Sequence, residues 1–211
     1  MTRAEPATTT AAEAAPESGF RRRLLDAMAE AIRERGYRDA TVADVVRAAR
    51  TSRRTFYEHF TSKQDCFIAL LTERNSETIQ RIYDAVDPRA PWRTQVRQAI
   101  EAWIEASKAD RTVTLAWIRD TPALGEDARR LHREAADAFV GLIQNLTATP
   151  EFGAPGVHRA TRRTATILYG GYRELIASAV EDGEDVSDLV EVAVETAIAL
   201  LGPRYEADDR E

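Results

Sequence analysis

The chain has 211 residues, of which 44% are hydrophobic, and a formal net charge of −6. This apolar content suffices for one or two compact units with buried cores, and no stretch approaches the roughly 18 consecutive apolar residues of a membrane span. The single cysteine, Cys66, excludes an intrachain disulfide and a metal site built from several cysteines. We therefore expect a cytoplasmic protein that has no contact with a membrane.

The two ends of the chain differ in composition from the rest. Residues 1–17 are rich in Ala, Thr, Pro and Glu, lack the apolar run of a secretory signal, and are predicted to form a disordered tail. Residues 205–211 are predicted to form an acidic tail.

The first third of the intervening chain predicts four helices. A first helix carries apolar residues four positions apart, begins at Ser18 and ends at Gly36. A second begins at Thr41, with Asp44 completing a capping box. A third covers residues 52–59, and a fourth begins at Ser62 and ends before the segment DPRAP.

The same helical spacing continues to the end of the chain. A fifth helix follows Trp92, a sixth covers residues 113–118 and a seventh residues 124–146. The Pro- and Gly-bearing segment TPEFGAPG predicts a loop. An eighth helix covers residues 157–181, ended by Gly183, and a ninth covers residues 187–201. The predicted fold class is all-α, with about nine helices.

The second and third helices are short and joined by a tight turn, an arrangement typical of a helix-turn-helix module. If Val45 and Val46 pack against Phe56 and Phe60, then Arg53, Arg54, Thr55 and Tyr57 face outward. The front of the third helix would then lie at base edges in a major groove, where Arg can donate two hydrogen bonds to guanine. The hydroxyl and backbone N–H groups of Thr41 would be free to bind phosphate.

The charge distribution agrees with a nucleic-acid partner. Residues 20–65 hold 11 Lys and Arg against 7 Asp and Glu, whereas residues 66–211 hold 17 against 25. A basic segment on an acidic remainder directs the polyanion to one end of the chain.

Residues 20–67 resemble the DNA-binding domain of TetR-family transcriptional regulators, in the segments TVADVV and TSRRTFYEHF and in the pair Ser62–Lys63. The resemblance implies a helix-turn-helix domain over residues 18–65 and a ligand-binding and dimerisation domain over residues 66–204. Together with the outward positions described above, it assigns DNA binding to Thr41, Arg50, Thr51, Ser52, Arg53, Arg54, Thr55, Tyr57, His59 and Lys63.

The turn between the second and third helices departs from the family pattern. The family commonly has Gly followed by Val, and this chain has Arg50 and Thr51. Because an arginine disfavours a positive φ, the turn is expected to differ slightly, while its charge offers a further phosphate contact.

The C-terminal helices carry several aromatic side chains, for which core packing is the simplest explanation. Collectively they can also line an apolar ligand pocket of the kind found between bundle helices, which the resemblance implies. The predicted pocket residues are Ile100, Trp103, Trp117, Phe139, Tyr169, Tyr172 and Arg173. Arg173 and Glu174 fit equally well as polar anchors for a ligand or as an ion pair at a subunit interface.

Two glycines in the segment LYGGYRELI favour a close approach of another helix. In the family the eighth and ninth helices pair with those of a second subunit, which predicts a homodimer. The predicted interface comprises Ile167, Gly171, Leu175, Ala179, Val190, Val194, Ala197 and Leu201. The alternative is that these residues pack only inside one chain.

No catalytic motif was found. The residues three before His59, His132 and His158 are Phe56, Arg129 and Pro155, so the Glu-x-x-His pairs of a di-iron bundle are absent, and we expect no enzyme, no metal and no cofactor. The sequence therefore predicts a dimeric repressor that binds a pseudo-palindromic operator and is released by a small hydrophobic or amphipathic effector. The alternative function is a helical carrier of small molecules without specific DNA binding.

Overall fold

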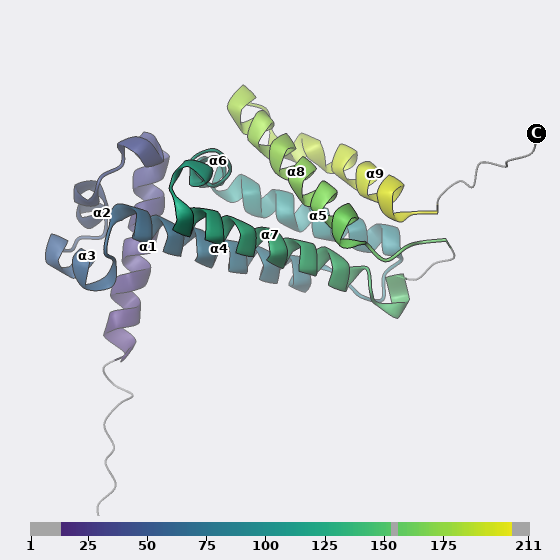
Figure 1. Ribbon diagram of the computed structural model, residues 1–211, viewed down its shortest axis with the longest axis horizontal. Helices are drawn as coiled ribbons and strands as arrows, with labels where there is room; N and C mark the ends of the chain where they lie inside the picture. The colour runs from purple at the N-terminus through teal and green to yellow at the C-terminus, as the bar shows by residue number, and fades with distance from the viewer. Residues whose placement is uncertain (1–13, 153–155, 204–211) are drawn as a thin grey trace, which may run out of the picture. The chain divides into compact units, whose positions relative to one another are not determined.

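The computed structural model describes residues 14–152 and 156–203, and within these ranges it contains helices and no strand (Figure 1). The chain divides into two units, residues 1–70 and 71–211. The division falls five residues after the domain boundary predicted from the sequence. The proposed acidic tail and the first thirteen residues of the proposed disordered tail lie outside the described residues.

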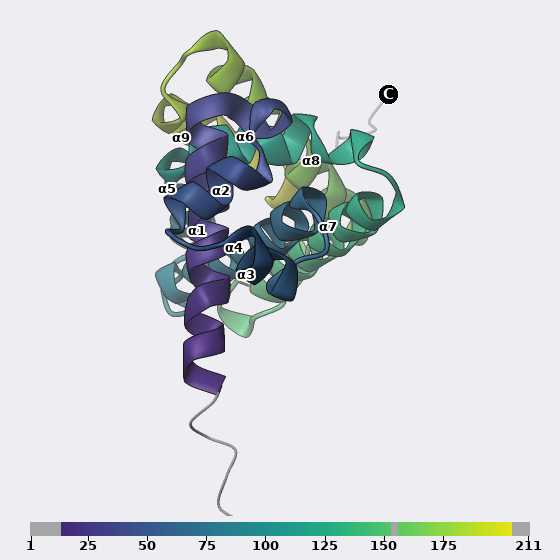
Figure 2. The same ribbon diagram turned by 90° about the vertical axis from the view of Figure 1, so that its left-hand side faces the viewer.

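The N-terminal unit contains α1 (Ala14–Asp39), α2 (Val42–Ala48), α3 (Arg53–His59) and the first residues of α4 (Lys63–Ala85). α1 begins four residues before the predicted start and so includes residues 14–17 of the segment predicted to be disordered. Gly36 interrupts α1 with a φ of 75° and a ψ of 160°, as its predicted role at a helix end requires. In Figures 1 and 2, α2 and α3 lie beside α1.

The core of this unit is drawn from all four helices. Its fully buried side chains include Leu24, Met28, Ile32, Val45, Phe56 and Phe67. Phe60 is also buried, and its ring centroid lies 5.7 Å from that of Phe56. Val45 is buried and Val46 half-buried, so the predicted apolar face of α2 is the buried one.

The C-terminal unit contains the rest of α4, α5 (Trp92–Ala109), α6 (Arg111–Arg119), α7 (Glu126–Leu146), α8 (Arg162–Asp182) and α9 (Val190–Leu201). Single 3-10 turns lie at Thr121–Ala123, Pro150–Phe152 and Val186–Leu189. One apolar cluster joins α5, α8 and α9, and a second joins Ile82 and Val86 of α4 to Phe139 of α7 and Tyr169 of α8. Nine α-helices are thus present in the described residues, as predicted.

α8 begins five residues later than predicted. Thr161 caps it by accepting a hydrogen bond from the Thr164 N–H, at 3.1 Å. The preceding segment bonds to other elements instead, because the N–H of His158 donates to the carbonyl of Leu201 and the N–H of Ala160 donates to the Thr147 hydroxyl. At its other end the helix terminates at Gly183, which is left-handed with a φ of 74°, as predicted.

Candidate nucleic-acid interface and ligand cavity

α3 presents its polar face to solvent because its apolar side chains are used in the domain core. The Ser52 hydroxyl caps the helix by accepting a hydrogen bond from the Thr55 N–H, at 3.1 Å. Arg53, Arg54 and Tyr57 are exposed, and Tyr57 leaves 57% of its surface to solvent although it is aromatic. Adjacent arginines beside an exposed aromatic ring form a surface suited to nucleic acid.

The remaining residues predicted to bind DNA lie around α3, with different degrees of exposure. Thr41, Arg50 and Ser52 are exposed, and Thr51, Thr55, His59 and Lys63 are half-buried. Their contacts with DNA are predictions.

Arg54 has an intramolecular partner on α3. Its Nε donates to Glu58 at 3.1 Å, and both side chains are largely exposed. An exposed pair of this kind contributes little to stability and exchanges readily. A DNA base can therefore replace Glu58 as the acceptor.

The turn between α2 and α3 adopts a left-handed conformation at Arg50, whose φ is 49°. The N–H of the next residue, Thr51, donates to the carbonyl of Val46 at 2.9 Å and closes the turn. The expectation that an arginine would avoid a positive φ here is thus wrong. The turn keeps the conformation that glycine adopts most easily, at a cost of about 1 kcal/mol.

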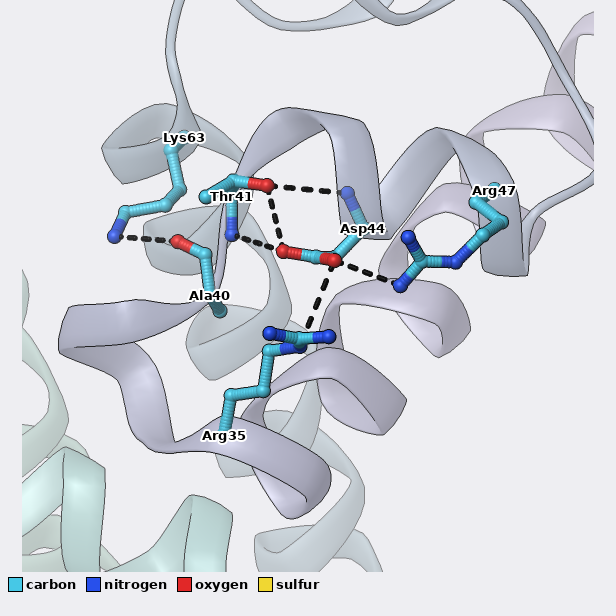
Figure 3. Close-up of polar contacts among 6 residues, drawn as sticks. All are labelled: Arg35, Ala40, Thr41, Asp44, Arg47 and Lys63. Atoms are coloured by element: carbon cyan, nitrogen blue, oxygen red, sulfur yellow. Dashed lines mark hydrogen bonds and ion pairs between the residues drawn. The ribbon is translucent and has the colours of Figure 1, made fainter.

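Thr41 and Asp44 form the predicted capping box at the start of α2 (Figure 3). Asp44 Oδ2 accepts hydrogen bonds from the N–H of Thr41 at 3.0 Å and from its hydroxyl at 2.6 Å. The same hydroxyl accepts from the Asp44 N–H. Because its own N–H and hydroxyl are used inside the domain, Thr41 does not offer the free phosphate donors expected from the sequence.

The Asp44 carboxylate also joins α2 to α1. Its Oδ1 lies 2.7 Å from Arg47 Nη2 and 3.5 Å from Arg35 Nε. The hydrogen bonds from Thr41 and Arg47 lower the pKa of Asp44 from 3.8 to about 2. The carboxylate is therefore ionised at neutral pH.

Lys63, which was predicted to bind phosphate, has partners inside the domain. Its Nζ donates to the carbonyls of Tyr37 at 2.8 Å, Ala40 at 2.9 Å and Arg38 at 3.2 Å, and it lies 4.5 Å from the centre of the Tyr37 ring. Figure 3 shows the contact with Ala40. These bonds fix the start of α4 against the end of α1, a positioning role that the sequence analysis missed because it joins residues far apart in the chain.

The C-terminal unit contains two adjacent cavities of about 70 Å³ each, both lined almost wholly by apolar atoms. They share a wall that includes Ile100, Ile143 and Tyr172. Of the predicted pocket residues, the structure gathers Ile100, Trp103, Phe139, Tyr169 and Tyr172 around one of them. Sequence reasoning missed Ile82, Leu142, Ile143 and Leu146, although all four belong to apolar stripes on α4 and α7.

Trp117 and Arg173 line neither of these two cavities, and their contact with a ligand stays a prediction. Instead Trp117 stacks on His132, with ring centroids 5.8 Å apart, and Arg173 Nη1 lies 3.0 Å from His132 Nε2. Glu174 does not pair with Arg173. It accepts two hydrogen bonds of 2.9 Å from Arg119, which also donates to Glu181.

The predicted interface residues divide between the surface and the core. Ile167 and Leu175 of α8 are exposed, at 62% and 36%, as is Gly171. Ala179, Val194, Ala197 and Leu201 are instead at most 3% exposed and belong to the core of the same chain, and Val190 packs against that core. The burial of the other four residues contradicts a subunit contact for them, and their alternative of packing within one chain holds, whereas the contact of the half-buried Val190 stays a prediction. The outward apolar residues of α9 are Val192 and Leu200.

Three further observations concern other functional classes. Among the described residues, no group of three or more His, Cys, Asp or Glu side chains could hold a metal ion. No helix in the same ranges combines the length and the apolar content needed to cross a membrane. Cys66 is buried, and burial raises the pKa of its thiol to about 12, so the thiol is unreactive at neutral pH.

Two curated proteins are similar to part of the chain. The chain is 27% identical over 95 residues to the HTH-type transcriptional activator FasR of Mycolicibacterium smegmatis. These aligned residues make up 45% of this chain and 43% of the relative. The chain is 24% identical over 123 residues to the fatty acid metabolism regulator protein of Bacillus subtilis, covering 58% and 63%. The matches thus span less than two thirds of either relative.

Similarity of fold to a solved structure covers more of the chain than similarity of sequence to the curated proteins does. The crystal structure of the transcriptional regulator FadR from Bacillus subtilis, in complex with stearoyl-CoA, matches with a TM-score of 0.71 over 85% of this chain and 98% of that chain, at 18% identity. Residues 24–70, which include the helix-turn-helix described above, match the model of the bacterial regulatory proteins of the tetR family. The family match is thus confined to residues 24–70, whereas the similarity of fold extends over most of the chain.

Proposed function

We propose that this protein is a DNA-binding transcriptional regulator that responds to a ligand. The single observation that carries the proposal is the exposure of Arg53, Arg54 and Tyr57 on a helix whose apolar side chains are buried. Arginines at the front of such a helix can reach base edges while the surrounding residues contact phosphate. This function places the protein in the cytoplasm, where bacterial DNA lies.

We further propose that the protein binds its operator as a homodimer. Exposed apolar residues on α8 and α9, together with the exposed Gly171, support a contact between the same helices of two subunits. A two-fold dimer presents two α3 helices and so requires a pseudo-palindromic operator, whose half-sites lie one helical turn of about 34 Å, or a multiple, apart.

The effector we propose is a molecule with a long apolar chain. The cavities offer it almost only apolar atoms. Two matches from Bacillus subtilis support this class: a protein named a fatty acid metabolism regulator, and a FadR structure in complex with stearoyl-CoA. An effector that binds one conformation of the regulator better than another shifts its DNA affinity by linkage, and a coupling of about 1–3 kcal/mol changes that affinity about 5- to 150-fold.

The helix α4 offers a continuous connection for this response, since it begins with Lys63 in the N-terminal unit and carries Ile82 of the cavity lining. We propose that effector binding repositions α4, weakens operator binding and relieves repression. FasR is named an activator, so a reporter driven by the operator must decide the direction: expression rises on deletion of the gene for a repressor and falls for an activator.

The proposal is tested by selecting bound sequences from a pool of random duplexes with the purified protein. We expect enrichment of one pseudo-palindromic sequence, and stearoyl-CoA should lower affinity for it. Arg54→Ala protein provides the control, since it should enrich the sequence less. A helical carrier would bind the acyl compound but enrich no sequence, and that result would overturn the proposal.

A further inference from the structure

A polar cluster lies at the edge of the cavity that is lined by Trp103, Phe139 and Tyr169. The proposed function gives this cluster no role. The cluster comprises Trp117 of α6, His132 of α7, and Tyr169 and Arg173 of α8. The guanidinium carbon of Arg173 lies 5.5 Å from the centre of the Tyr169 ring. Tyr169 is itself part of the cavity wall and stacks on Phe139, with ring centroids 5.0 Å apart. The cluster and the cavity therefore share one residue.

Three buried polar atoms of this cluster have no hydrogen-bond partner among the described residues. They are His132 Nδ1, Arg173 Nε and the hydroxyl oxygen of Tyr169; the Trp117 side chain lies near enough to this hydroxyl to lower its pKa but makes no hydrogen bond of normal geometry with it. Buried polar atoms are normally hydrogen-bonded, because leaving one without a partner is unfavourable. Three such atoms on neighbouring side chains indicate a site that a bound group completes.

All three atoms can act as donors. Arg173 cannot accept a hydrogen bond, so His132 Nε2 accepts from Arg173 Nη1 and the proton of the neutral imidazole resides on Nδ1. Burial, followed by the charge of Arg173, lowers the pKa of His132, which keeps the ring neutral at neutral pH. The site thus offers the N–H of His132, the N–H of Arg173 and the O–H of Tyr169 to an acceptor.

The charge of the cluster is compensated only from a distance, by the carboxylate of Glu174. No ion pair involves Arg173 in the described part of the chain, and the nearby acidic residues Glu174 and Glu181 are bonded to Arg119. Burial lowers the pKa of the Arg173 guanidinium, although this group remains charged at neutral pH. A half-buried cation without a close counterion is unfavourable, and an anion would relieve the cost.

We propose that Arg173, His132 and Tyr169 form an anion subsite beside the apolar cavity. This inference rests on the proposed function and specifies its effector: an apolar chain that ends in a carboxylate. The apolar chain of the effector would lie along Phe139 and Tyr169. Its carboxylate would accept hydrogen bonds from Arg173 and from the Tyr169 hydroxyl. A phosphate of an acyl-CoA supplies the same acceptor chemistry, and the test below separates the two sources.

The test measures binding of dodecanoate, dodecanol and dodecanoyl-CoA by calorimetry to the full-length protein and to its Arg173→Met variant. The wild type should bind dodecanoate at least about tenfold more tightly than dodecanol, because a charge-assisted hydrogen bond is lost with the alcohol. Arg173→Met should remove this preference and leave dodecanol binding unchanged. Arg133→Met changes an exposed arginine next to His132 in sequence and serves as the matched control.

A second variant, Tyr169→Phe, removes only a hydroxyl and should weaken dodecanoate binding without affecting thermal unfolding. If Arg173→Met weakens dodecanoyl-CoA but not dodecanoate, the anion subsite stands and its ligand is the phosphate. Dodecanoate and dodecanoyl-CoA binding that both variants leave unaffected would overturn the proposal, as would equal affinity of the wild type for dodecanoate and dodecanol when Arg173→Met also leaves dodecanoyl-CoA binding unchanged. Failure to bind any duplex would overturn only the regulatory function, since the calorimetry requires no DNA.

Discussion

The ammonium nitrogen of Lys63 lies 2.8 Å from the carbonyl oxygen of Tyr37, and this hydrogen bond joins the start of α4 to the end of α1 across 26 residues of sequence. The carbonyls near the end of α1 carry partial negative charge, which a cation satisfies well. The lysine that the family resemblance assigned to phosphate is thus first a positioning residue for the helices that carry α3.

Lys63→Met should destabilise the N-terminal unit. A hydrogen bond to a charged group contributes about 1.5–3 kcal/mol to stability, and the contribution is smaller for a half-buried group such as Lys63, because water screens its charge. We expect faster hydrogen exchange of the backbone amides of α1 and α2 in the variant. Arg54→Met, which changes a side chain that is 89% exposed, is the control and should leave exchange unchanged. Equal exchange in both variants would contradict the positioning role.

Asp44→Asn should change how stability depends on pH. The pKa of Asp44 is lowered from 3.8 to about 2 in the folded state, so the carboxylate stabilises the fold above pH 3.8 and this contribution is lost as pH falls through about 2. Acid titration followed by circular dichroism should show that wild-type stability falls more steeply below about pH 4 than that of the variant. Parallel curves would argue against the network around Asp44.

Arg50→Gly should be more stable than Arg50→Ala. Both variants remove the charge, but only glycine adopts the φ of 49° without steric cost, and we expect a difference of up to about 1 kcal/mol in the free energy of unfolding. Urea titration of the two variants measures it. If the arginine also contacts phosphate, both variants should reduce the salt dependence of DNA binding by about one unit of slope.

Arg54 and Glu58 should affect DNA recognition in opposite directions. Arg54→Ala should lower affinity for the selected operator by about 1–3 kcal/mol and lower affinity for random duplexes much less, because the lost contacts are to base edges. Glu58→Gln should tighten binding to both, since it removes an acidic competitor for Arg54 and a charge that repels DNA. Electrophoretic mobility shifts at fixed salt measure both effects. An equal loss on the operator and on random duplexes would remove Arg54 from the residues that read sequence.

Gly171→Leu should yield monomers. A Cβ atom at this position meets nothing within 4 Å in the single chain, and the position is exposed, so loss of the dimer would report on assembly. Gly141→Leu on α7 is the matched control, because a side chain there also has open space. Sedimentation velocity should show a monomer for the first variant and a dimer for the second. A dimeric Gly171→Leu protein would refute the proposed interface.

The helices themselves could be predicted from the sequence because their determinants are local. The Thr41–Asp44 box, the Ser52 cap and Gly183 all act within a few residues of the helix end that they define. The outward position of Arg54 followed in the same way, since 3.6-residue periodicity places it opposite Phe56. Local spacing also placed five of the seven predicted pocket residues around one cavity.

What the tertiary structure alone decided is which surface each apolar or charged side chain meets. The spacing of Val194, Ala197 and Leu201 predicts a buried stripe equally well inside one chain or between two, and the fold buries it inside one. The partners of Lys63 and Arg173 were hidden for a related reason: each lies at least 23 residues away in sequence, on another element. Periodicity encodes the direction of a side chain relative to its own helix axis, whereas the identity of its neighbour depends on how the helices pack.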